Sequence, residues 1–263
     1  MTKLTLLTAC YNSAATVGDT LKSVNAQNYD DIEHIIIDGA SKDETVAICN
    51  EVGTRITKIV SEPDKGIYDA YNKGLKHASG EIIGFINSDD YYATDQVANQ
   101  VMEIFQDPSI EACHADLVYV RPQNTNQVER HWRSEPITRR TLSRGLIPAH
   151  PTVFLRREVY DRVGNFDLEY RLAADYEFLL RTFFIHQVKS YYAPEIWVRM
   201  RSGGATGGNV KSIFRQNNEI LAAQQKHGVK CSKLQFYSVK IMDRIMQRAR
   251  GRFVNAPDLL TAS

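Results

Sequence analysis

The sequence predicts an α/β fold in which a mostly parallel, Rossmann-like sheet is flanked by helices and followed by a C-terminal helical extension. Short apolar, β-rich runs alternate with helical segments through about residue 105, as in a doubly wound sheet. The run at 33–38 contains Ile35-Ile36-Ile37, which indicates a strand buried on both faces, as in a parallel sheet. Two amphipathic helical segments, at 211–227 and 233–250, follow a glycine-rich stretch near residue 205.

The first half divides into regular units. Ser13 can cap a first helix that runs to about residue 27, and Gly80 can close the third helix. The strands are expected at 4–8, 33–38, 56–61 and 81–87, and the helices between them at 13–27, 42–52 and 67–78.

The pattern changes beyond residue 105. Two strands around a polar turn are expected at 111–121 and 127–133, helices at 157–163 and 175–185, and a strand at 187–193. The segment 202–209 contains four glycines and is expected to be a mobile loop.

Length and composition suit one large domain, or one domain with an appendage. The chain has 263 residues, and 43% of them are hydrophobic, which is ordinary for a globular core. Met1-Thr2-Lys3 leads directly into a strand-like run, so neither a signal peptide nor a membrane span is expected there. The four cysteines are far apart without CxxC spacing, which favours reduced thiols in a cytosolic protein over a zinc site or disulfides.

The net charge of +1 conceals an asymmetry. Residues 211–253 hold ten Lys or Arg and two acids, a net +8, whereas residues 1–210 carry −6. The sequence therefore predicts a mildly acidic body with a basic C-terminal arm.

Polar motifs occur in a fixed order, most of them directly after a predicted strand. They are Thr8-Ala9-Cys10-Tyr11-Asn12, Asp38-Gly39-Ala40-Ser41, Glu62-Pro63-Asp64-Lys65-Gly66-Ile67-Tyr68-Asp69, Asn87-Ser88-Asp89-Asp90 and Ala174-Asp175-Tyr176-Glu177. Ligands bind at the carboxyl edge of open α/β sheets. Carboxylates gathered at that edge can hold a metal and a sugar nucleotide.

The adjacent carboxylates of Asp89 and Asp90 repel each other unless a cation or hydrogen-bond donors compensate. A hard divalent ion that keeps waters and substrate phosphates fits that need. The alternative is that Asp90 is the N-cap of the next helix.

Together the motifs resemble family 2 inverting glycosyltransferases of the GT-A fold, especially the bacterial branch that builds O-antigen, capsule and exopolysaccharide. The resemblance covers roughly residues 3–200, and its most specific segment is 61–74, Ser-Glu-Pro-Asp-Lys-Gly-Ile-Tyr-Asp-Ala-Tyr-Asn-Lys-Gly. It implies a catalytic domain at 1–209, with a nucleotide-binding part at about 1–105 and an acceptor-binding part at about 106–209. Residues 210–263 would be the basic amphipathic extension.

The resemblance also implies roles for individual residues. Asp175 would be the catalytic base and Asp90 the metal ligand, while Asp89 would face the ribose or the donor sugar. Thr8, Ala9 and Tyr11 would line the uracil pocket, with Asp38 accepting from uracil N3–H and Asp64 against the nucleoside. The remaining nucleotide-sugar-binding candidates are Glu62, Lys65, Asp69, Asn87, His150 and Arg201; Arg199, Arg201 and Ser202 resemble a flexible loop that covers the diphosphate.

Two positions depart from the family pattern. The aspartate motif commonly begins with Asp, but this chain has Asn87, whose amide can bond a ribose hydroxyl but brings no charge to a metal. The carboxylate often found before the base is Ala174 here, so any acceptor contact made by that carboxylate is lost.

Several of these residues also have a structural alternative. Asp38 could stabilise the Asp-Gly turn or cap the helix at 42–52, and Asp64 and Asp69 could be turn and first-turn helix acids. Asp175 could be only the acid at the start of its helix, and Tyr11 only a rim aromatic. His150 could be a packed histidine, and the arginine loop an ordinary exposed one.

The expected function is inverting transfer of a hexosyl or N-acetylhexosaminyl group from a UDP-sugar, with Mn²⁺ or Mg²⁺, in surface polysaccharide synthesis. The acceptor would be a saccharide or a polyprenyl-diphosphate-saccharide. The alternatives are a nucleotide-binding protein without transfer activity, or a nucleic-acid binder acting through the basic arm; the favoured function involves no nucleic acid. A Rossmann dehydrogenase is disfavoured because no GxGxxG follows the first strand.

The last helix predicts a membrane-surface role. Leu234, Ile241, Met242, Ile245 and Phe253 fall broadly on one side of it, and Lys233, Lys240, Arg244 and Arg248 on a neighbouring side. That pattern suits a helix lying on an anionic membrane, and the segment is too charged to span one. The protein is therefore expected to be cytoplasmic and peripheral on the inner face of the cytoplasmic membrane, and a homo-oligomer is allowed. The alternative is a helix that packs on the catalytic body with a solvated basic face.

Overall fold

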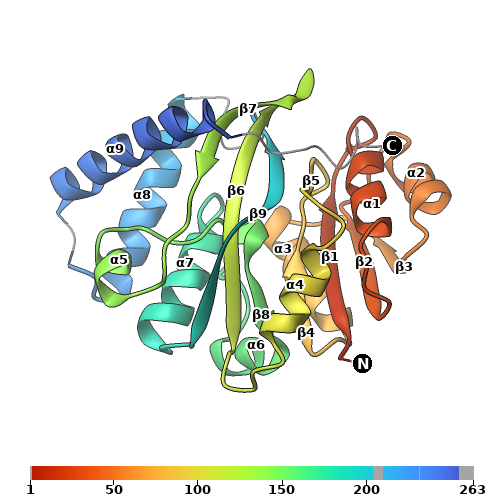
Figure 1. The fold of residues 1–263 in the computed structure, drawn as a ribbon, viewed down its shortest axis with the longest axis horizontal. Coiled ribbons are helices and arrows are strands. Elements are labelled where there is room, and N and C mark those ends of the chain that lie inside the picture. The colour runs from red at the N-terminus through yellow and green to blue at the C-terminus, as the bar shows by residue number, and fades with distance from the viewer. Residues whose placement is uncertain (1, 204–209, 231, 255–263) are drawn as a thin grey trace.

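The computed structural model describes residues 2–203, 210–230 and 232–254. A single curled mixed sheet runs through the described molecule, with helices packed on it (Figure 1). Its strands are β1 (Leu4–Cys10), β2 (Ile32–Asp38), β3 (Ile56–Ser61), β4 (Ile82–Phe85), β5 (Asp90–Tyr92), β6 (Ala112–Arg121), β7 (Asn124–Trp132), β8 (Phe154–Arg156) and β9 (Ser190–Arg201). The main order is β3-β2-β1-β4-β8-β6-β9-β5, and β7 pairs with β6.

The helices lie between the strands and after the last one. They are α1 (Val17–Asn25), α2 (Thr45–Val52), α3 (Ile67–His77), α4 (Val97–Ile104), α5 (Arg139–Ser143), α6 (Arg157–Val163), α7 (Ala174–Leu180), α8 (Val210–Lys226) and α9 (Lys233–Gly251). A 3₁₀ turn at His150–Thr152 precedes β8, and a π-helical turn at Arg181–Ile185 continues α7.

The first four strands form the parallel part of the sheet, as the alternating pattern predicts. Ile35, Ile36 and Ile37 of β2 are all buried, which confirms that this strand is covered on both faces. Ile36 packs in a cluster with residues of α1 and α2, whereas Ile35 and Ile37 pack in another with residues of α3. These helices therefore cover opposite faces and leave the carboxyl ends of the strands at one edge.

The second half of the sheet is mixed and differs from the sequence expectation. β9 has twelve residues, so the strand expected at 187–193 is too short. Arg199 and Arg201 lie on β9, and Arg199 is fully buried, so their assignment to a flexible loop is wrong. Residues 204–209 of the expected loop lie outside the described residues. Asp90 begins strand β5, so the alternative that it caps a helix is also wrong.

Helices α8 and α9 lie on the side of the molecule away from β3 (Figure 1), where α9 packs on β7 and α8 packs on α7. Phe236, Gln247 and Gly251 of α9 are buried, and the α-carbon of Gly251 comes so near the Arg130 backbone of β7 that an added Cβ would lie 2.8 Å from the Arg130 Cα. One face of α9 therefore packs on the body of the protein, as the alternative to membrane binding stated.

The opposite face of α9 exposes apolar side chains. The exposed large ones are Leu234, Ile241, Met242, Ile245 and Met246, and Phe253 follows just after the helix. Arg244, Arg248 and Arg252 are also exposed beside them. Within the described residues, none of the helices is both long and apolar enough to cross a bilayer.

Candidate active site

Three loops meet at the carboxyl edge of the parallel strands. The loop after β1 joins the loop after β2 where the Asn12 N–H donates to the Ser41 hydroxyl at 2.8 Å and the Lys42 N–H donates to Asn12 Oδ1 at 2.9 Å. The loop after β1 also contacts the loop after β4, through the hydroxyls of Ser13 and Ser88, which are 2.8 Å apart. The polar motifs of the sequence are therefore brought together, as the position of strand ends in an α/β sheet requires.

Asp38 ends β2 and holds the turn that follows it. Its buried carboxylate accepts from the Ser41 hydroxyl and, at 3.0 Å, from the Ser41 N–H; the Ser61 hydroxyl of β3 donates to it at 2.6 Å. Ala40, inside this turn, has a φ of 60°, a left-handed conformation that L-residues adopt at a cost. Asp38 therefore stabilises this turn, which was its structural alternative to binding uracil.

Tyr11 and Asp64 both lie close to Gly39. A Cβ added to Gly39 would come within 2.5 Å of Asp64 Oδ2 and 3.3 Å of the Tyr11 ring. Only a glycine allows this approach without displacing a neighbour. The Tyr11 ring is 65% exposed, so a large aromatic face is presented to solvent beside a carboxylate.

The 62–69 motif is organised by local contacts. Asp64 Oδ1 accepts from the Gly66 N–H at 2.8 Å, and Asp69 Oδ2 from the Lys65 N–H at 3.0 Å, so both acids have the turn and first-turn roles considered above. Glu62 is exposed and forms an ion pair with Lys73 at 2.8 Å. The Glu62 side chain is 53% exposed, so this ion pair contributes little stability.

Asn87 orients Asp90. The Asn87 amide nitrogen donates to Asp90 Oδ2 at 2.8 Å, and its Oδ1 accepts from the Tyr71 hydroxyl. Thr20 of α1 donates to the Asp90 carbonyl at 2.6 Å and fixes the backbone of the loop. Asp90 is fully buried, whereas Asp89 is partly exposed.

Ionisation of the Asp89 and Asp90 carboxyl groups is unfavourable in this structure. Burial raises the pKa of Asp89, and burial together with the charge of Asp89 raises the pKa of Asp90 well above its usual range. Asn87 and Arg201 only partly offset this effect on Asp90. Asp90 Oδ1 is buried and has no hydrogen-bond partner.

These features fit a divalent cation. An orphaned carboxylate oxygen beside a second carboxylate offers hard oxygen ligands and a charge that a cation would compensate. No group of three or more His, Cys, Asp or Glu suited to a metal occurs among the residues that the structure describes.

Asp175 lies in the first turn of α7. Its Oδ1 accepts from the Tyr68 hydroxyl of α3 at 2.9 Å and from the Tyr176 N–H at 2.8 Å. The carboxylate is partly exposed, so it combines a fixed orientation with access from outside.

An aromatic group connects Asp175 with the Asn87–Asp90 loop. Tyr71 lies between Tyr68 and His150, with ring centroids 6.1 and 5.7 Å away. His150 also packs 5.1 Å from Phe85, and its burial lowers its pKa to about 4. His150 is therefore a packed, neutral histidine at neutral pH, as its structural alternative states. It forms part of the wall between the two acidic centres.

Arg201, at the end of β9, binds the loop that contains Asp89 and Asp90. Its Nη1 donates to the Asp89 carbonyl at 2.7 Å, its Nη2 forms an ion pair with Asp19, and its guanidinium lies 5.2 Å from the centre of the Tyr91 ring. The residue is thus in the site as predicted, but on a rigid strand.

Thr8 and Ala9 are directed into the interior. The Thr8 hydroxyl is 2.9 Å from Nε2 of the buried His34, and Ala9 packs in the core. Their side chains do not reach the surface of the site, so any ligand contact there would involve the backbone.

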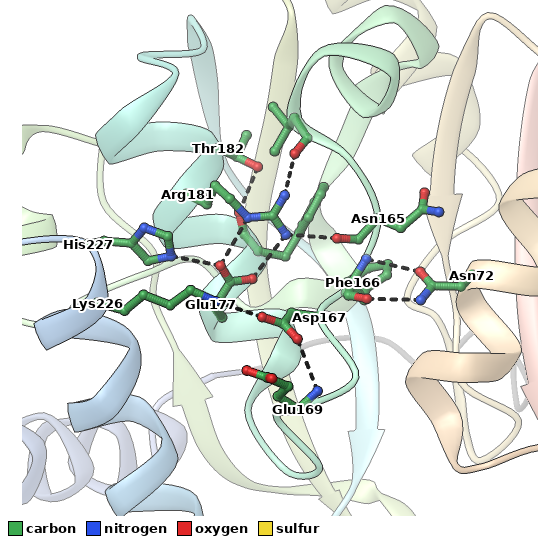
Figure 2. Close-up of polar contacts among 12 residues, drawn as sticks. Asn72, Asn165, Phe166, Asp167, Glu169, Glu177, Arg181, Thr182, Lys226 and His227 are labelled. Atoms are coloured by element: carbon green, nitrogen blue, oxygen red, sulfur yellow. Dashed lines mark hydrogen bonds and ion pairs between the residues drawn. The ribbon is translucent and has the colours of Figure 1, made fainter.

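The segment before α7 is clamped from three sides (Figure 2). The Asn72 side chain exchanges two hydrogen bonds with the backbone of Phe166, at 2.9 and 3.0 Å. Arg181 donates to the carbonyls of Val163 and Asn165. Lys226 of α8 forms an ion pair with Asp167 at 2.8 Å. The chain that leads to Asp175 is thereby fixed to α3, α7 and α8.

Sequence reasoning assigned no role to several residues that build the site. Tyr68 and Tyr71 are inside the most specific motif, and their spacing of three on one helix could have marked them as neighbours. Ser41 and Ser61 carried no signal, because a serine after a strand is common. Glu219 of α8, whose carboxylate accepts from the backbone before α7, is distant in sequence and could not be found by spacing.

A sequence model of Glycosyl transferase family 2 matches residues 5–164, which is more than half of the chain. The chain belongs to glycosyl transferase family 2. This family 2 enzyme is 32% identical over 180 residues to an uncharacterized glycosyltransferase of Mycobacterium tuberculosis, with 68% of each chain covered. It is 38% identical over 102 residues to the Escherichia coli UDP-Glc:alpha-D-GlcNAc-diphosphoundecaprenol beta-1,3-glucosyltransferase WfaP, covering 38% of this chain and 41% of that protein.

Solved structures identify the fold of this glycosyltransferase as GT-A. S. aureus TarS 1-349 in complex with UDP-GlcNAc matches with a TM-score of 0.63 and 16% identity over 97% of this chain and 70% of that one. The mannosyltransferase PcManGT from Pyrobaculum calidifontis, in complex with GDP-Man and Mn²⁺, matches with a TM-score of 0.60 and 15% identity, covering 97% and 83%. At such identities the likeness concerns the fold alone.

Proposed function

We propose that this glycosyltransferase moves a hexosyl or N-acetylhexosaminyl group from a UDP-sugar to a saccharide acceptor with inversion at the anomeric carbon. The observation that carries the proposal is the single chain of contacts from Asp175 through Tyr68, Tyr71 and Asn87 to Asp90. It joins a partly exposed carboxylate suited to act as a base with a second acidic centre suited to a diphosphate and its cation. The E. coli relative, named for a UDP-Glc donor, supports the choice of nucleotide.

The nucleotide would bind over the loops after β1 and β2. The exposed Tyr11 ring offers a stacking surface for uracil, and Asp64 lies near it beside Gly39. Asp38 would accept from uracil N3–H once its turn opens, because its carboxylate is buried in this structure and accepts from Ser41 and Ser61. The other proposed contacts come from the backbone of Thr8 and Ala9 and from the side chains of Glu62, Lys65, Asp69, Asn87, Asp89 and Arg201.

Asp175 would remove a proton from an acceptor hydroxyl as that oxygen attacks the anomeric carbon. The attack comes from the face opposite UDP, so one displacement converts an α-linked donor into a β-linked product. The Tyr68 hydroxyl and the Tyr176 N–H orient the carboxylate, and both leave Oδ2 free to accept the proton. His150, neutral and packed, would close the wall behind the reacting sugar.

Asp90 would hold Mn²⁺ or Mg²⁺, beside the carboxylate of Asp89. When bound, such an ion supplies charge neutralisation at the two phosphates of the departing UDP. Asn87 fixes the rotamer of Asp90 and so the direction of its unpaired oxygen.

A donor screen tests this function. The purified protein is incubated with Mn²⁺ and each of a panel of UDP-sugars, and thermal stabilisation and UDP release are measured. Ligand-linked stability rises with donor affinity, so one donor should stabilise the protein more than UDP alone and release UDP faster with an acceptor present. Stabilisation by UDP without transfer from any donor would indicate a nucleotide-binding protein instead. Binding of DNA or RNA without UDP affinity would indicate a nucleic-acid binder.

Asp38→Ala should weaken UDP binding by about 1–3 kcal/mol, because a buried donor on uracil would lose its acceptor. Ser61→Ala is the matched control: it removes one hydrogen bond to Asp38 but leaves the carboxylate in place. Isothermal titration with UDP should give near wild-type affinity for Ser61→Ala. Equal losses for both variants would mean that Asp38 acts only by shaping the turn.

The acceptor would be lipid-diphosphate-linked, in surface polysaccharide synthesis, with the enzyme peripheral on the inner face of the cytoplasmic membrane. The name of the E. coli relative, which includes a diphosphoundecaprenol acceptor, supports this, and so does the outward face of α9. Exposed apolar side chains flanked by arginines suit an anionic lipid surface, where each basic residue is worth about 1 kcal/mol. A homo-oligomer is part of the same proposal.

The double variant Ile241→Glu and Ile245→Glu should abolish sedimentation of the full-length protein with phosphatidylglycerol vesicles at low salt. Both side chains are more than half exposed, so the fold should persist. Asn218→Glu with Gln225→Glu, at exposed positions of α8, makes the same change in charge away from this face and should leave sedimentation intact. If the wild-type protein does not sediment, or both double variants behave alike, α9 has no lipid-binding face.

A further inference from the structure

Helix α8 supplies the N-terminal cap that α7 lacks. The N-cap residue of α7, Ala173, makes no side-chain capping hydrogen bond. Instead, Glu219 Oε2 of α8 accepts from the N–H groups of Leu172 and Ala173, at 2.7 and 3.1 Å. Gln216, one turn earlier, donates to the Leu172 carbonyl at 3.2 Å. Both polar groups of the Leu172 backbone are therefore bound by α8.

The same face of α8 continues along α7. Gln224 donates to the Tyr176 hydroxyl at 2.8 Å, and His227 Nε2 is 2.7 Å from Glu177 Oε1. Glu177 is 1% exposed and also binds Arg181 through both carboxylate oxygens, at 3.0 Å each (Figure 2). The contacts of α8 thus bracket Asp175, with Leu172 and Ala173 before it and Tyr176 and Glu177 after it.

The Glu219 carboxylate forms strong hydrogen bonds with the backbone before α7. Its side chain is only 15% exposed, and a carboxylate that accepts two backbone N–H groups forms charge-assisted hydrogen bonds. Its other oxygen, Oε1, pairs with the more exposed Arg215 at 3.3 Å. The negative charge also lies at the N-terminal end of α7, where the helix dipole favours it.

We propose that Glu219 is a positioning residue for transfer: by holding the backbone at Leu172 and Ala173, it sets where α7 begins and how the Asp175 carboxylate meets the acceptor. The inference rests on the proposed role of Asp175 as the base. Asp175 is two residues beyond Ala173, within the turn that this cap fixes. A displacement of about 1 Å at a reacting group can cost up to roughly 10²-fold in rate.

Glu219→Ala in the full-length protein should lower kcat by about 10–100-fold at saturating donor. The affinity for UDP should stay within about twofold of wild type, because the nucleotide loops are on other strands. The rate is read as UDP release from the donor that the screen selects. Hydrogen exchange should accelerate at Leu172 and Ala173 but not in α3.

Two matched variants separate positioning from general stability. Glu219→Gln keeps an oxygen that can accept from the backbone and should restore most of the rate. Arg215→Ala removes the ion pair of Glu219 without touching the cap and should leave the rate unchanged. If Glu219→Ala does not fold, Gln216→Ala, which releases only the Leu172 carbonyl, should show a smaller loss in the same direction.

The inference is overturned if Glu219→Ala melts earlier yet keeps the wild-type kcat, or if UDP affinity falls as much as kcat. Asp175→Asn, measured in parallel, separates the proposed base from the proposed positioning role of Glu219. A wild-type rate for Asp175→Asn overturns the proposed base. Loss of rate in Asp175→Asn with a normal rate in Glu219→Ala overturns only the positioning role.

Discussion

Replacing Asp175 with asparagine should reduce transfer at saturating donor and acceptor by roughly 10²–10⁴-fold. The amide has almost the same shape as the carboxylate, and its oxygen can still accept from the Tyr68 hydroxyl and the Tyr176 N–H. It cannot accept the proton of the acceptor hydroxyl, so the loss should appear in kcat. Initial rates of UDP release over a donor series, together with titration by UDP, measure both quantities.

Tyr68→Phe is the companion to this variant. It removes the hydroxyl that orients Asp175 but leaves the base, so its kcat should fall less than that of Asp175→Asn. If Asp175→Asn instead loses UDP affinity and keeps its rate at saturation, Asp175 is a binding residue. A rate lower for Tyr68→Phe than for Asp175→Asn would transfer the principal role to the tyrosine.

Asp90→Asn should nearly abolish transfer while preserving, or even raising, the melting temperature of the metal-free protein. The buried carboxyl has a raised pKa because ionising it is unfavourable in that position beside Asp89. A neutral amide removes this unfavourable charge, so the fold should not suffer. Activity should be lost because charge neutralisation on the departing diphosphate is worth several kcal/mol.

Thermal melts with and without Mn²⁺ test this independently of turnover. The wild-type protein should melt at a higher temperature with Mn²⁺ and UDP than with UDP alone, and Asp90→Asn should lose that increment. Asp19→Asn is the control, since Asp19 pairs with Arg201 nearby and is not one of the proposed ligands. A normal increment and normal turnover in Asp90→Asn would mean that Asp90 is not a metal ligand.

The parallel half of the sheet could be predicted because its signals are local. Each of the first strands is an apolar run followed by a polar motif, and the rule that strand ends meet at one edge places those motifs together. Asp38, Asp64 and the Asn87–Asp90 loop are accordingly near one another. Their individual orientation could not be predicted, since it depends on partners such as Ser61 and Tyr71 from other elements.

The mixed half was harder because its pairing is long-range. β5 is only three residues long and exists through its pairing with β9, more than a hundred residues later. Arg199 and Arg201 are typical of a polar loop by composition, yet the fold buries Arg199 and uses Arg201 to secure the Asp89 backbone. Periodicity cannot detect a charged residue whose environment is supplied by tertiary contacts.

The cap that α8 provides to α7 has a consequence for how such enzymes diversify. The family match ends at residue 164, before both Asp175 and Glu219, so the two lie in the part of the chain that the shared family pattern does not cover. A recombination event or an engineered graft that exchanged one of these helices without the other would leave the Leu172 and Ala173 amides facing a foreign surface. We therefore expect crossover points between related transferases to be tolerated before residue 165 or after residue 228, but not between them. Libraries of chimaeric enzymes aimed at new acceptors would do best to treat that interval as one inherited module.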